Sequence, residues 1–375
     1  MGGELGAASP VSGRASAGRR LALLALVAAN LALVLTVSTG FTPLADIIAP
    51  LTGHLLGIGL AASLALLARR RMLALLTAGV AVTIGLHGWL GLARCCRAPM
   101  PMATESGVTK ISTHHPGSRL TVLALNTWDR HGDPDRLARY LATAPADVVV
   151  LSQLGPDRRR LLARLEAAFP FQVVCSDARP CALALLSRLP LEAAGAARIA
   201  PGQPGFVWAR LGGSLTVIGT HLDSPGRDPW LHERQMSALA RFIRRIDGPL
   251  VLAGDLNTSP WSNSFRRLRA TTSLVPAGLL MPSWPAWPLA LPQMALDHIL
   301  VSPELTVAAA GTGPAVGSDH LPVWAQLERH PIVLDRRRLL VRRYASRPAA
   351  ARAHLGAELL ADLGGEHVGA RDLRQ

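Results

Sequence analysis

The chain has few charged residues, few aromatic residues and few cysteines for its length. Only 17% of its 375 residues are charged, whereas 49% are hydrophobic. This balance excludes an intrinsically disordered chain and indicates membrane-spanning segments. Four Cys in a chain of this length exclude a disulfide-dense mini-protein. The length itself predicts about two domains.

Acidic residues are outnumbered by basic ones, and the formal net charge is +14 at pH 7. Lys110 is the only lysine, so almost all of the positive charge comes from Arg. With the abundance of Ala, Leu, Gly and Pro, this indicates a coding bias as much as a selected property. The charge is compatible with anionic lipid, nucleic acid or anionic substrates and does not choose among them.

Three apolar stretches near the beginning of the chain predict transmembrane helices. Residues 21–42, 47–68 and 72–93 each have about the twenty residues that a helix needs to cross the hydrocarbon core. They contain no Lys or Arg before their ends. We therefore expect residues 1–96 to form a membrane anchor of three transmembrane helices.

The placement of Arg predicts the orientation of this anchor. Arg14, Arg19 and Arg20 precede the first stretch, and residues 69–71 between the second and third are all Arg. The connection at residues 40–45 carries no basic residue, so the N-terminus and the second loop are expected in the cytoplasm. Three spans then place the rest of the chain on the extracytoplasmic side of the cytoplasmic (inner) membrane, as part of a multi-pass protein in contact with the lipid bilayer.

The cysteines fit this topology. Cys175 and Cys181 flank the short segment CSDARPC and can form a local disulfide in an oxidising compartment. A metal site is a weaker interpretation, because no second pair of Cys or His lies nearby. The sequence leaves open the state of the adjacent Cys95 and Cys96.

The remaining chain divides into a linker, a domain and a tail. Residues 97–118 mix Pro, Gly, Ser, Thr and His without periodicity, which is typical of a linker. Residues 119–327 alternate short β-branched runs, such as 120–125 and 147–151, with amphipathic stretches such as 158–169. This pattern predicts an α/β or α+β domain with a full core. Residues 328–375 are rich in Arg and predict a basic surface tail, with attachment to anionic lipid as an alternative.

Polar side chains follow the predicted strands, at the points where they end. Carboxylates, carboxamides and imidazoles at the ends of adjacent strands would converge on one rim of a sheet. Oxygen ligands of this kind hold a hard cation such as Mg²⁺, while His and Asn bind phosphoryl oxygens and activate water. They are Asn126; Ser152 and Gln153; His221 in THLDSP; Asp255 and Asn257 in GDLNTSP; Asp297 and His298 in LDHILVS; and Ser318, Asp319 and His320 in GSDHLPV.

Each motif alone has an ordinary structural explanation. Asp255 and Asn257 could bond their own backbone in a turn, and His221 could be a satisfied structural histidine. Asp297 could cap a helix, and the SDH triplet could begin one. It is their joint occurrence, in this order and at strand ends, that predicts a site for metal-assisted phosphate chemistry.

These motifs resemble the endonuclease/exonuclease/phosphatase superfamily, which includes deoxyribonuclease-like nucleases, apurinic-site endonucleases, inositol polyphosphate phosphatases and bacterial sphingomyelinases. GDLNTSP and SDHLPV are the most specific of them, and the resemblance covers residues 119–327. With the anchor, the chain resembles a membrane-bound bacterial branch. The resemblance implies a four-layer sandwich of two β-sheets flanked by helices, here preceded by three transmembrane helices.

The resemblance also implies roles for the site residues. Asp255 would position or deprotonate the attacking water, and Asn257 would bind the phosphate beside it. His221 would contact the phosphoryl group, and His320 would hydrogen-bond the scissile phosphate with its ring oriented by Asp297. The family's division of acid and base roles between Asp255 and the histidines is not carried over.

The implied metal site departs from the family pattern at one position. Asn126 would orient a metal ligand or a phosphate oxygen, and Asp319 would lie at the metal. After the second strand the family has Gln-Glu, with the Glu as principal Mg²⁺ ligand, whereas this chain has Ser152 and Gln153. A carboxamide oxygen can still coordinate Mg²⁺, or Mn²⁺ in its place, but the negative charge is lost. Asp129 is a weaker candidate for supplying that charge.

The leading hypothesis is therefore a membrane-anchored extracytoplasmic phosphoesterase that depends on Mg²⁺. Its substrate would be a nucleic acid, a phospholipid or a small phosphoester, and no obligate protein partner is expected. The alternative is a catalytically weakened pseudoenzyme that binds a phosphorylated ligand at the membrane surface. A third hypothesis makes the spans the functional part, against which no transport motif is found. Trp284 and Trp287 could rim the cleft or pack on the sandwich edge.

Overall fold

The structure is a computed structural model, and the chain divides into two units, Met1–Glu328 and Arg329–Gln375. The predicted linker, nearly all of the predicted tail, and most of the first and third predicted spans lie outside the residues that the structure describes. The described residues are 20–21, 23–28, 31, 42–67, 78–79, 82, 119–129, 131–155, 158–175, 182–198, 205–212, 215–278, 280–286 and 294–329.

Two six-stranded sheets form the centre of the domain. The first has the order β11-β12-β1-β2-β4-β3, with bounds Leu305–Thr312, Val323–Arg329, Arg119–Asp129, Val148–Leu154, Ala184–Ser187 and Phe171–Val174. The second has the order β5-β6-β7-β8-β10-β9, with bounds Leu191–Arg198, Gly205–Leu211, Leu215–His221, Leu250–Asp255, Asp297–Val301 and Val275–Pro276.

Both faces of the central strands are buried, because alternate side chains enter different cores. In β1, Val122 and Ala124 belong to the core between the two sheets, while Leu123 and Leu125 pack under the outer helices. β2 repeats this pattern, which explains its continuous apolar run VVVL. The strands predicted at residues 120–125 and 147–151 are thus confirmed.

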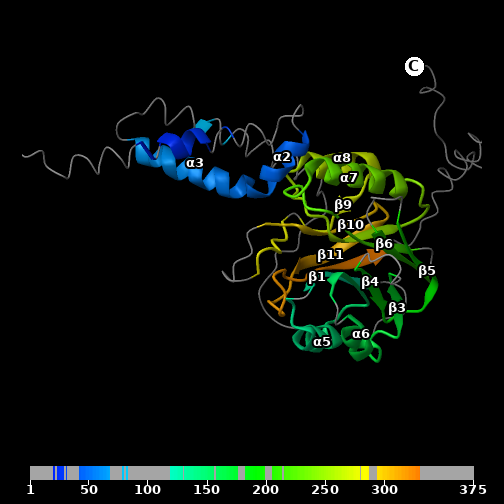
Figure 1. Cartoon of the computed structure of the whole chain (residues 1–375). Coiled ribbons are helices and arrows are strands. Elements are labelled where there is room, and N and C mark those ends of the chain that lie inside the picture. Colours follow the sequence, from blue (N-terminus) through cyan, green and yellow to red (C-terminus); the bar gives the residue numbers. More distant parts are fainter. Residues whose placement is uncertain are drawn as a thin grey trace, which may run out of the picture. The chain divides into compact units, whose positions relative to one another are not determined.

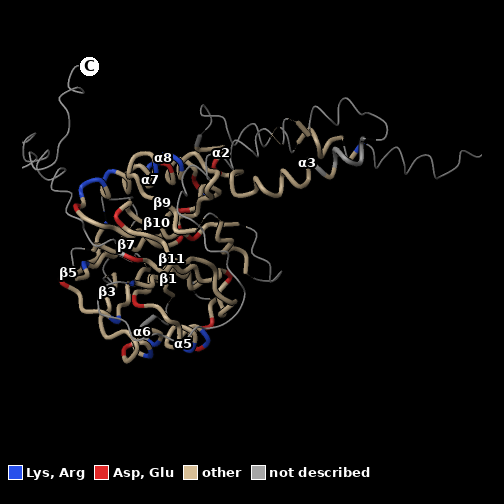
Figure 2. The backbone as a smooth tube through the Cα atoms, turned by 180° about the vertical axis from the view of Figure 1, so that it is seen from behind, with Lys and Arg blue, Asp and Glu red and all other residues tan. Residues whose placement is uncertain are grey.

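Helices cover the outer face of each sheet (Figure 1). On the first sheet lie α5, Pro134–Thr143, and α6, Arg158–Leu165, whose apolar side chains share one core with β1 and β2. On the second lie α7, Pro229–Ile243, and α8, Asn263–Thr272, which share another core with β7 and β8. The four layers match the predicted sandwich. Figure 2 shows that the basic residues gather on these outer helices.

Strand directions decide where the site lies. β1 and β2 are parallel, as are β7 and β8, and the hydrogen bond between Asn126 of β1 and Asp255 of β8 shows that the carboxyl ends of both pairs lie at one rim of the sandwich. β10 is antiparallel to β8, and β12 is antiparallel to β1. The beginnings of β10 and β12 therefore lie at the same rim as the ends of the four parallel strands.

The described part of the N-terminal region is helical. It comprises α2, Thr42–Ile48, a short 3-10 helix η1, Ala49–Leu51, and α3, Thr52–Leu67. The expected connection at residues 40–45 is thus partly wrong, since α2 begins at Thr42; Pro43 is tolerated in the first turn of a helix. Within the described residues, no helix combines the length and the hydropathy required for a membrane crossing.

Cys175 is disulfide-bonded, and its pairing with Cys181 stays a prediction. It follows β3 directly and is buried against the core between the sheets. Cys181, Cys95 and Cys96 lie outside the described residues.

Candidate active site

The predicted site residues lie along the rim where the parallel strands end. Asn126 is in β1, His221 is the last residue of β7, and Asp255 is the last residue of β8. Asp297 begins β10 instead of following a strand, and it pairs in register with Asp255 because the two strands are antiparallel. The expectation that every site residue ends a strand was wrong for Asn126 and Gln153, which lie inside β1 and β2. It was also wrong for Asp297, which begins β10, and for His320, which precedes β12, and their places at this rim follow from the antiparallel direction of those strands.

The backbone at this rim adopts conformations that are rare elsewhere. Trp128, Gln153 and Asn257 have φ of 62°, 51° and 48°, although none of them is glycine. Gly254 has φ of 137°, and a Cβ there would lie 2.0 Å from the carbonyl oxygen of Thr220. Only glycine therefore fits immediately before Asp255. Local strain of this kind is characteristic of functional sites.

Asp255 is the centre of a buried cluster of polar side chains, and it is 1% exposed. Its Oδ2 accepts a hydrogen bond of 2.9 Å from Nδ2 of Asn126, and its Oδ1 accepts one of 2.8 Å from the backbone N–H of Asn257. His221 approaches from β7, with Nε2 3.6 Å from Oδ2 of Asp255. The carboxylate is thereby held from both sheets.

Asn257 links Asp255 to His221. Its Nδ2 donates a 2.8 Å hydrogen bond to the carbonyl oxygen of Leu222 and lies 3.2 Å from Nε2 of His221. Both Asn257 and His221 are partly exposed, whereas Asp255 beneath them is buried. This edge of the cluster is therefore open to a ligand.

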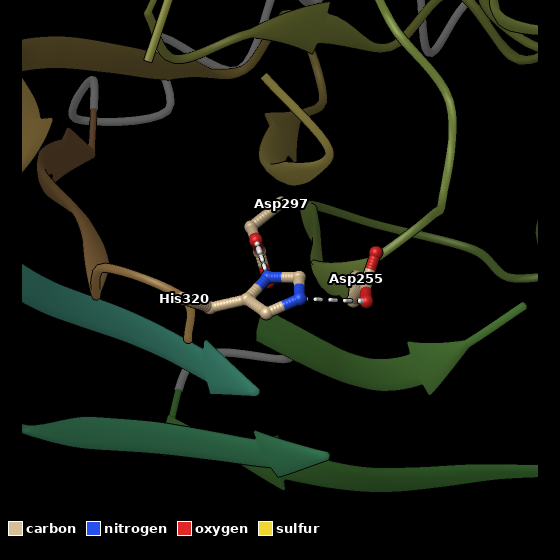
Figure 3. Close-up of side chains that lie close together, drawn as sticks. All are labelled: Asp255, Asp297 and His320. Atoms are coloured by element: carbon tan, nitrogen blue, oxygen red, sulfur yellow. Dashed lines mark hydrogen bonds and ion pairs between the residues drawn. The ribbon is translucent and has the colours of Figure 1, made fainter. Parts of the chain in front are cut away.

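His320 stands between two carboxylates, as Figure 3 shows. Its Nδ1 is 2.6 Å from Oδ2 of Asp297, and its Nε2 is 3.9 Å from Oδ2 of Asp255. The backbone N–H of His320 donates to Oγ of Ser318 at 3.1 Å, and Ser318 donates to the carbonyl oxygen of Asn126 at 2.6 Å. These contacts fix the orientation of the ring against both neighbours.

The electrostatics of the cluster follow from these contacts. Burial lowers the pKa of His320, but the charge and the hydrogen bond of Asp297, with the charges of Asp255 and Asp319, raise it to about 9. Burial would raise the pKa of Asp297, yet the charge and hydrogen bond of His320, together with smaller contributions from Ser283 and His298, keep it below the usual value. His320 and Asp297 are accordingly an ion pair at neutral pH.

The pKa of Asp255 is shifted in the opposite direction from that of Asp297. Burial raises its pKa above the usual value, and the charge of Asp297 adds to this effect. The charges of His320 and His221 and the Asn126 hydrogen bond lower the pKa but do not cancel the increase. Asp255 is therefore a stronger base than an ordinary aspartate, which suits a group that accepts a proton.

Asp319 and Gln153, two of the predicted metal ligands, lie outside this hydrogen-bonded cluster. Oδ2 of Asp319 accepts a 3.0 Å hydrogen bond from the indole N–H of Trp284, while its Oδ1 is buried without a partner among the described residues. Gln153 is partly exposed and directly follows Ser152, which pairs with Asn126. Asn126 is the predicted metal ligand that the cluster includes. The side chain of Asp129 lies outside the described part of the chain.

The donor set fits a divalent cation. Asp255, Asp297 and His320 offer ligand atoms within 4.8 Å of one another, but the imidazole of His320 could bind a metal ion only in its neutral form, which the ion pair with Asp297 disfavours. Oδ1 of Asp297, like Oδ1 of Asp319, is buried and unpartnered within the described residues. Buried carboxylate oxygens without donors are costly unless a cation compensates them, and such oxygens are the ligands that Mg²⁺ prefers.

The contacts of three residues near the cluster, Ser283, Trp284 and His298, could not be predicted from the sequence. Ser283 accepts a 3.2 Å hydrogen bond from the backbone N–H of Asp297, and Trp284 holds Asp319. The sequence singled out Trp284 only as a residue of the cleft rim or sandwich edge; Trp287 lies outside the described residues. His298 is buried, its ring is tilted by 43° against that of Phe265 with the centroids 4.6 Å apart, and its Nε2 is hydrogen-bonded to the carbonyl oxygen of Thr258 at 2.7 Å. It is a structural histidine, and no local sequence signal marks Ser283.

Together the cluster offers a base, a cation at neutral pH and several amide donors around one open edge. Comparison with known families agrees with this chemistry: the sequence model described as "Endonuclease/Exonuclease/phosphatase family" matches residues 122–320, more than half of the chain. Comparison with curated proteins finds no match.

Several solved structures are similar at low identity. An endonuclease/exonuclease/phosphatase from Beutenbergia cavernae is 21% identical, with 56% of this chain and 72% of that chain covered and a TM-score of 0.45. Sphingomyelinase C from Streptomyces griseocarneus is 21% identical, with 56% and 99% covered and a TM-score of 0.43. A mannosyl-6-phosphatase from Bacteroides thetaiotaomicron is 16% identical, with 56% and 99% covered and a TM-score of 0.48. From the family match, the chain belongs to the endonuclease/exonuclease/phosphatase family, whose members are hydrolases that act on phosphoester bonds.

Proposed function

We propose that this protein is a membrane-anchored, metal-dependent phosphoesterase with its catalytic domain on the extracytoplasmic side. The observation that carries the catalytic part is the placement of His320 between Asp297, 2.6 Å away, and Asp255, 3.9 Å away. The carboxylate of Asp297 keeps the imidazole of His320 charged, and the carboxylate of Asp255 is basic enough to accept a proton.

Asp255 is the base of the proposed reaction. Water attacks the phosphorus atom in line with the leaving oxygen, and one proton of this water passes to the carboxylate of Asp255. The bond between phosphorus and the leaving oxygen breaks, and that oxygen takes up a proton from solvent. Asn126 and the backbone N–H of Asn257 fix both oxygens of this carboxylate, so its orientation is set before substrate binds. No covalent enzyme intermediate forms.

His320, His221 and Asn257 bind the phosphoryl group. Nδ1 of His320 is held by Asp297, which leaves the N–H at Nε2 to donate to a phosphoryl oxygen as negative charge develops. Asn257 and His221 lie at the exposed edge of the cluster and contact the same group. Preorganised donors of this kind supply a large share of the rate enhancement in acyl and phosphoryl transfer.

The proposed metal is Mg²⁺, which Mn²⁺ could replace. Asp319 through its unpartnered Oδ1, Gln153 and Asn126 would hold it. When bound, the cation neutralises charge on the phosphoryl oxygens.

The membrane part of the proposal is supported by composition. α3, within the second predicted span, contains no charged residue over Thr52–Leu67. The Arg pattern favours the extracytoplasmic side. Proximity to a bilayer favours a lipid-borne phosphoester over nucleic acid or a small phosphoester as substrate. An alkaline phosphatase fusion after residue 118 should be active, and an inactive fusion would overturn this topology.

The catalytic proposal is tested with the full chain purified in detergent, using bis-(p-nitrophenyl) phosphate while Mg²⁺ and Mn²⁺ are titrated. We expect metal-dependent hydrolysis in the wild type. Folded wild-type protein that hydrolyses neither this diester nor p-nitrophenyl phosphate, at any metal concentration, would contradict it.

A second candidate function rests on Gln153, which stands where the family has a glutamate. A domain that has lost the principal metal charge could bind a phosphorylated ligand without hydrolysing it. Wild-type inactivity with a gain of activity in Gln153→Glu would support this pseudoenzyme function. Activity in the wild type would exclude it.

A further inference from the structure

A carboxylate from the N-terminal region is buried in the catalytic domain. Asp46 in α2 is 1% exposed, and its two oxygens accept hydrogen bonds of 2.7 Å from the backbone N–H of Asn263 and 3.0 Å from that of Ser264. These residues open α8, more than two hundred positions later in the chain. Ala45 and Ala49 are buried beside Asp46, and α2 contacts both α7 and α8.

This contact replaces a cap that α8 lacks in its own sequence. Helices α5 and α7 begin with Asp133 and Asp228, whose side chains accept from two backbone N–H groups each. Ser262 occupies the same position in α8 but makes no capping bond, because its hydroxyl is engaged with Ser259 instead. Unpaired N–H groups at a buried helix start are costly. The carboxylate of Asp46, from another segment of the chain, therefore accepts the hydrogen bonds of two backbone N–H groups that Ser262 does not cap.

The capped end of α8 is connected to the strand that carries the base. The hydroxyl of Ser264 lies 3.3 Å from that of Thr258, and Thr258 follows Asn257 directly. The loop from Asp255 to α8 is short and buried at residues 258–260. A displacement of the start of α8 would therefore be transmitted through Thr258 to Asn257.

The hydroxyl of Ser264 is also connected, through His232 of α7, to the loop that follows His221. Oγ of Ser264 is 3.4 Å from Nε2 of His232, whose Nδ1 donates a 2.8 Å hydrogen bond to the carbonyl oxygen of Asp223. Gln235 adds to this by bonding both the backbone N–H and the carboxylate of Asp223. Asp223 lies two residues after His221. A network of buried and partly buried groups therefore runs from Asp46 to the loops that carry Asn257 and His221.

We propose that α2 is a docking element that joins the N-terminal region to the catalytic domain, and that Asp46 is a positioning residue for the site. Its carboxylate holds the start of α8 and, through Ser264 and His232, the loops that carry Asn257 and His221. Helix α2 spans the junction of the first two apolar stretches, so this contact would hold the catalytic domain against the membrane-proximal part of the chain. The positioning role rests on the proposed function, whereas the docking does not.

Docking is tested with the full chain carrying a protease site within residues 97–118. After cleavage in detergent, we expect the catalytic fragment of the wild type to remain bound to the N-terminal fragment. Asp46→Ala should release it. Release from the wild type, or equal retention in Asp46→Ala, would each overturn the docking role. Hydrogen exchange gives a second readout: the amides of Asn263 and Ser264 should exchange at least about fivefold faster in Asp46→Ala, the factor expected for a lost cap.

Positioning is tested by kinetics on bis-(p-nitrophenyl) phosphate with saturating Mg²⁺. We expect kcat/KM to fall about tenfold in uncleaved Asp46→Ala, since small displacements of binding groups have effects of this order. Asp46→Asn, which keeps one acceptor oxygen, should recover part of the loss. The matched control is Asp133→Ala, which removes the equivalent cap of α5 without touching this network.

The outcomes separate the two proposals. A loss in Asp46→Ala no greater than in Asp133→Ala would overturn the positioning role. A wild type that is inactive, yet keeps its fragments together after cleavage, would count against the proposed phosphoesterase and leave the docking supported.

Discussion

The two halves of the catalytic rim are built differently. On the second sheet, His221, Asp255 and Asn257 are joined to one another by hydrogen bonds and close charge contacts. On the first sheet, Asp319 keeps a buried oxygen without a partner among the described residues, and Gln153 stands outside the cluster. The second-sheet half is therefore largely hydrogen-bonded as the chain folds, apart from Oδ1 of Asp297, which has no partner in the described part of the chain, whereas Asp319 and Gln153 of the first-sheet half lie outside the cluster.

This difference separates two kinds of catalytic preparation. Groups that satisfy one another are preorganised and need no ligand to hold their geometry. A buried carboxylate oxygen without a donor is expensive, and a bound cation compensates it. The comparison therefore predicts that changes in the second-sheet half alter the rate itself, while changes in the first-sheet half alter the dependence on metal.

The largest effect is expected at His320, which spans the two halves. His320→Ala removes the cationic donor and leaves Asp297 as a buried carboxylate without a partner. We expect kcat/KM to fall about 10³-fold, within the range for a positioned acid, base or charged donor. The loss should persist at every Mg²⁺ concentration. Recovery of activity at high Mg²⁺ would assign His320 to the metal instead.

Asp297 should show the next largest effect. Asp297→Asn keeps an oxygen that accepts from Nδ1 of His320 but loses the charge that stabilises the imidazolium. We expect kcat/KM to fall about 10²-fold while KM changes little, because the donor is weakened and not displaced. The split between kcat and KM, measured at saturating Mg²⁺, checks this. A variant as active as the wild type would show that the ion pair is not used in the reaction.

Gln153→Glu addresses the other half of the rim. The added charge should lower the Mg²⁺ concentration for half-maximal activity about tenfold, because a carboxylate binds a hard cation more strongly than a carboxamide. The matched control is Gln326→Glu, which adds the same charge on β12 at the opposite end of the first sheet, opposite Thr121. Equal shifts in both variants would mean a general charge effect and no metal contact at Gln153.

Much of the sandwich could be predicted from the sequence, because its strands are buried on both faces. The apolar run at residues 147–151 shows the pattern of a buried strand within a few residues, and the amphipathic stretch at residues 158–169 shows that of a helix. Asn126, His221 and Asp255 came together for the same reason, since motifs near the ends of neighbouring parallel strands share a rim. Here local patterns were sufficient.

Contacts between distant segments could not be predicted in this way. The indole N–H of Trp284 donates to Asp319, 35 positions later in the chain, and Asp46 accepts from Asn263 of α8, 217 positions later. Neither contact has a periodic or local signature. The missing cap at Ser262 shows only once the hydroxyl is seen to bond Ser259. The sequence did not indicate a role for Asp46, although a single acidic residue between two apolar stretches is unusual.

The smallest expected effect compares two buried histidines with opposite electrostatics. His320 is kept charged by carboxylates, whereas burial lowers the pKa of His232, and the nearby Asp223 and Asp46 only partly offset this. His232 is neutral in the folded protein, with Nδ1 donating to Asp223 and Nε2 accepting from Ser264. The unfolded chain takes up a proton at this residue at about pH 6.5, where the folded chain does not.

The free energy of unfolding should therefore decrease as the pH falls below about 6.5, by up to about 1.4 kcal/mol per pH unit for this group. The contribution is absent above that pH, since His232 is then neutral in both states. Urea unfolding of the full chain in detergent between pH 5 and 8, compared with His232→Gln, measures the difference in slope. His131→Gln, at an exposed histidine, is the control. If His232→Gln and the wild type lose stability with the same slope below pH 6.5, the histidine is protonated in the fold, and the network from Asp46 to His221 would have to contain an imidazolium.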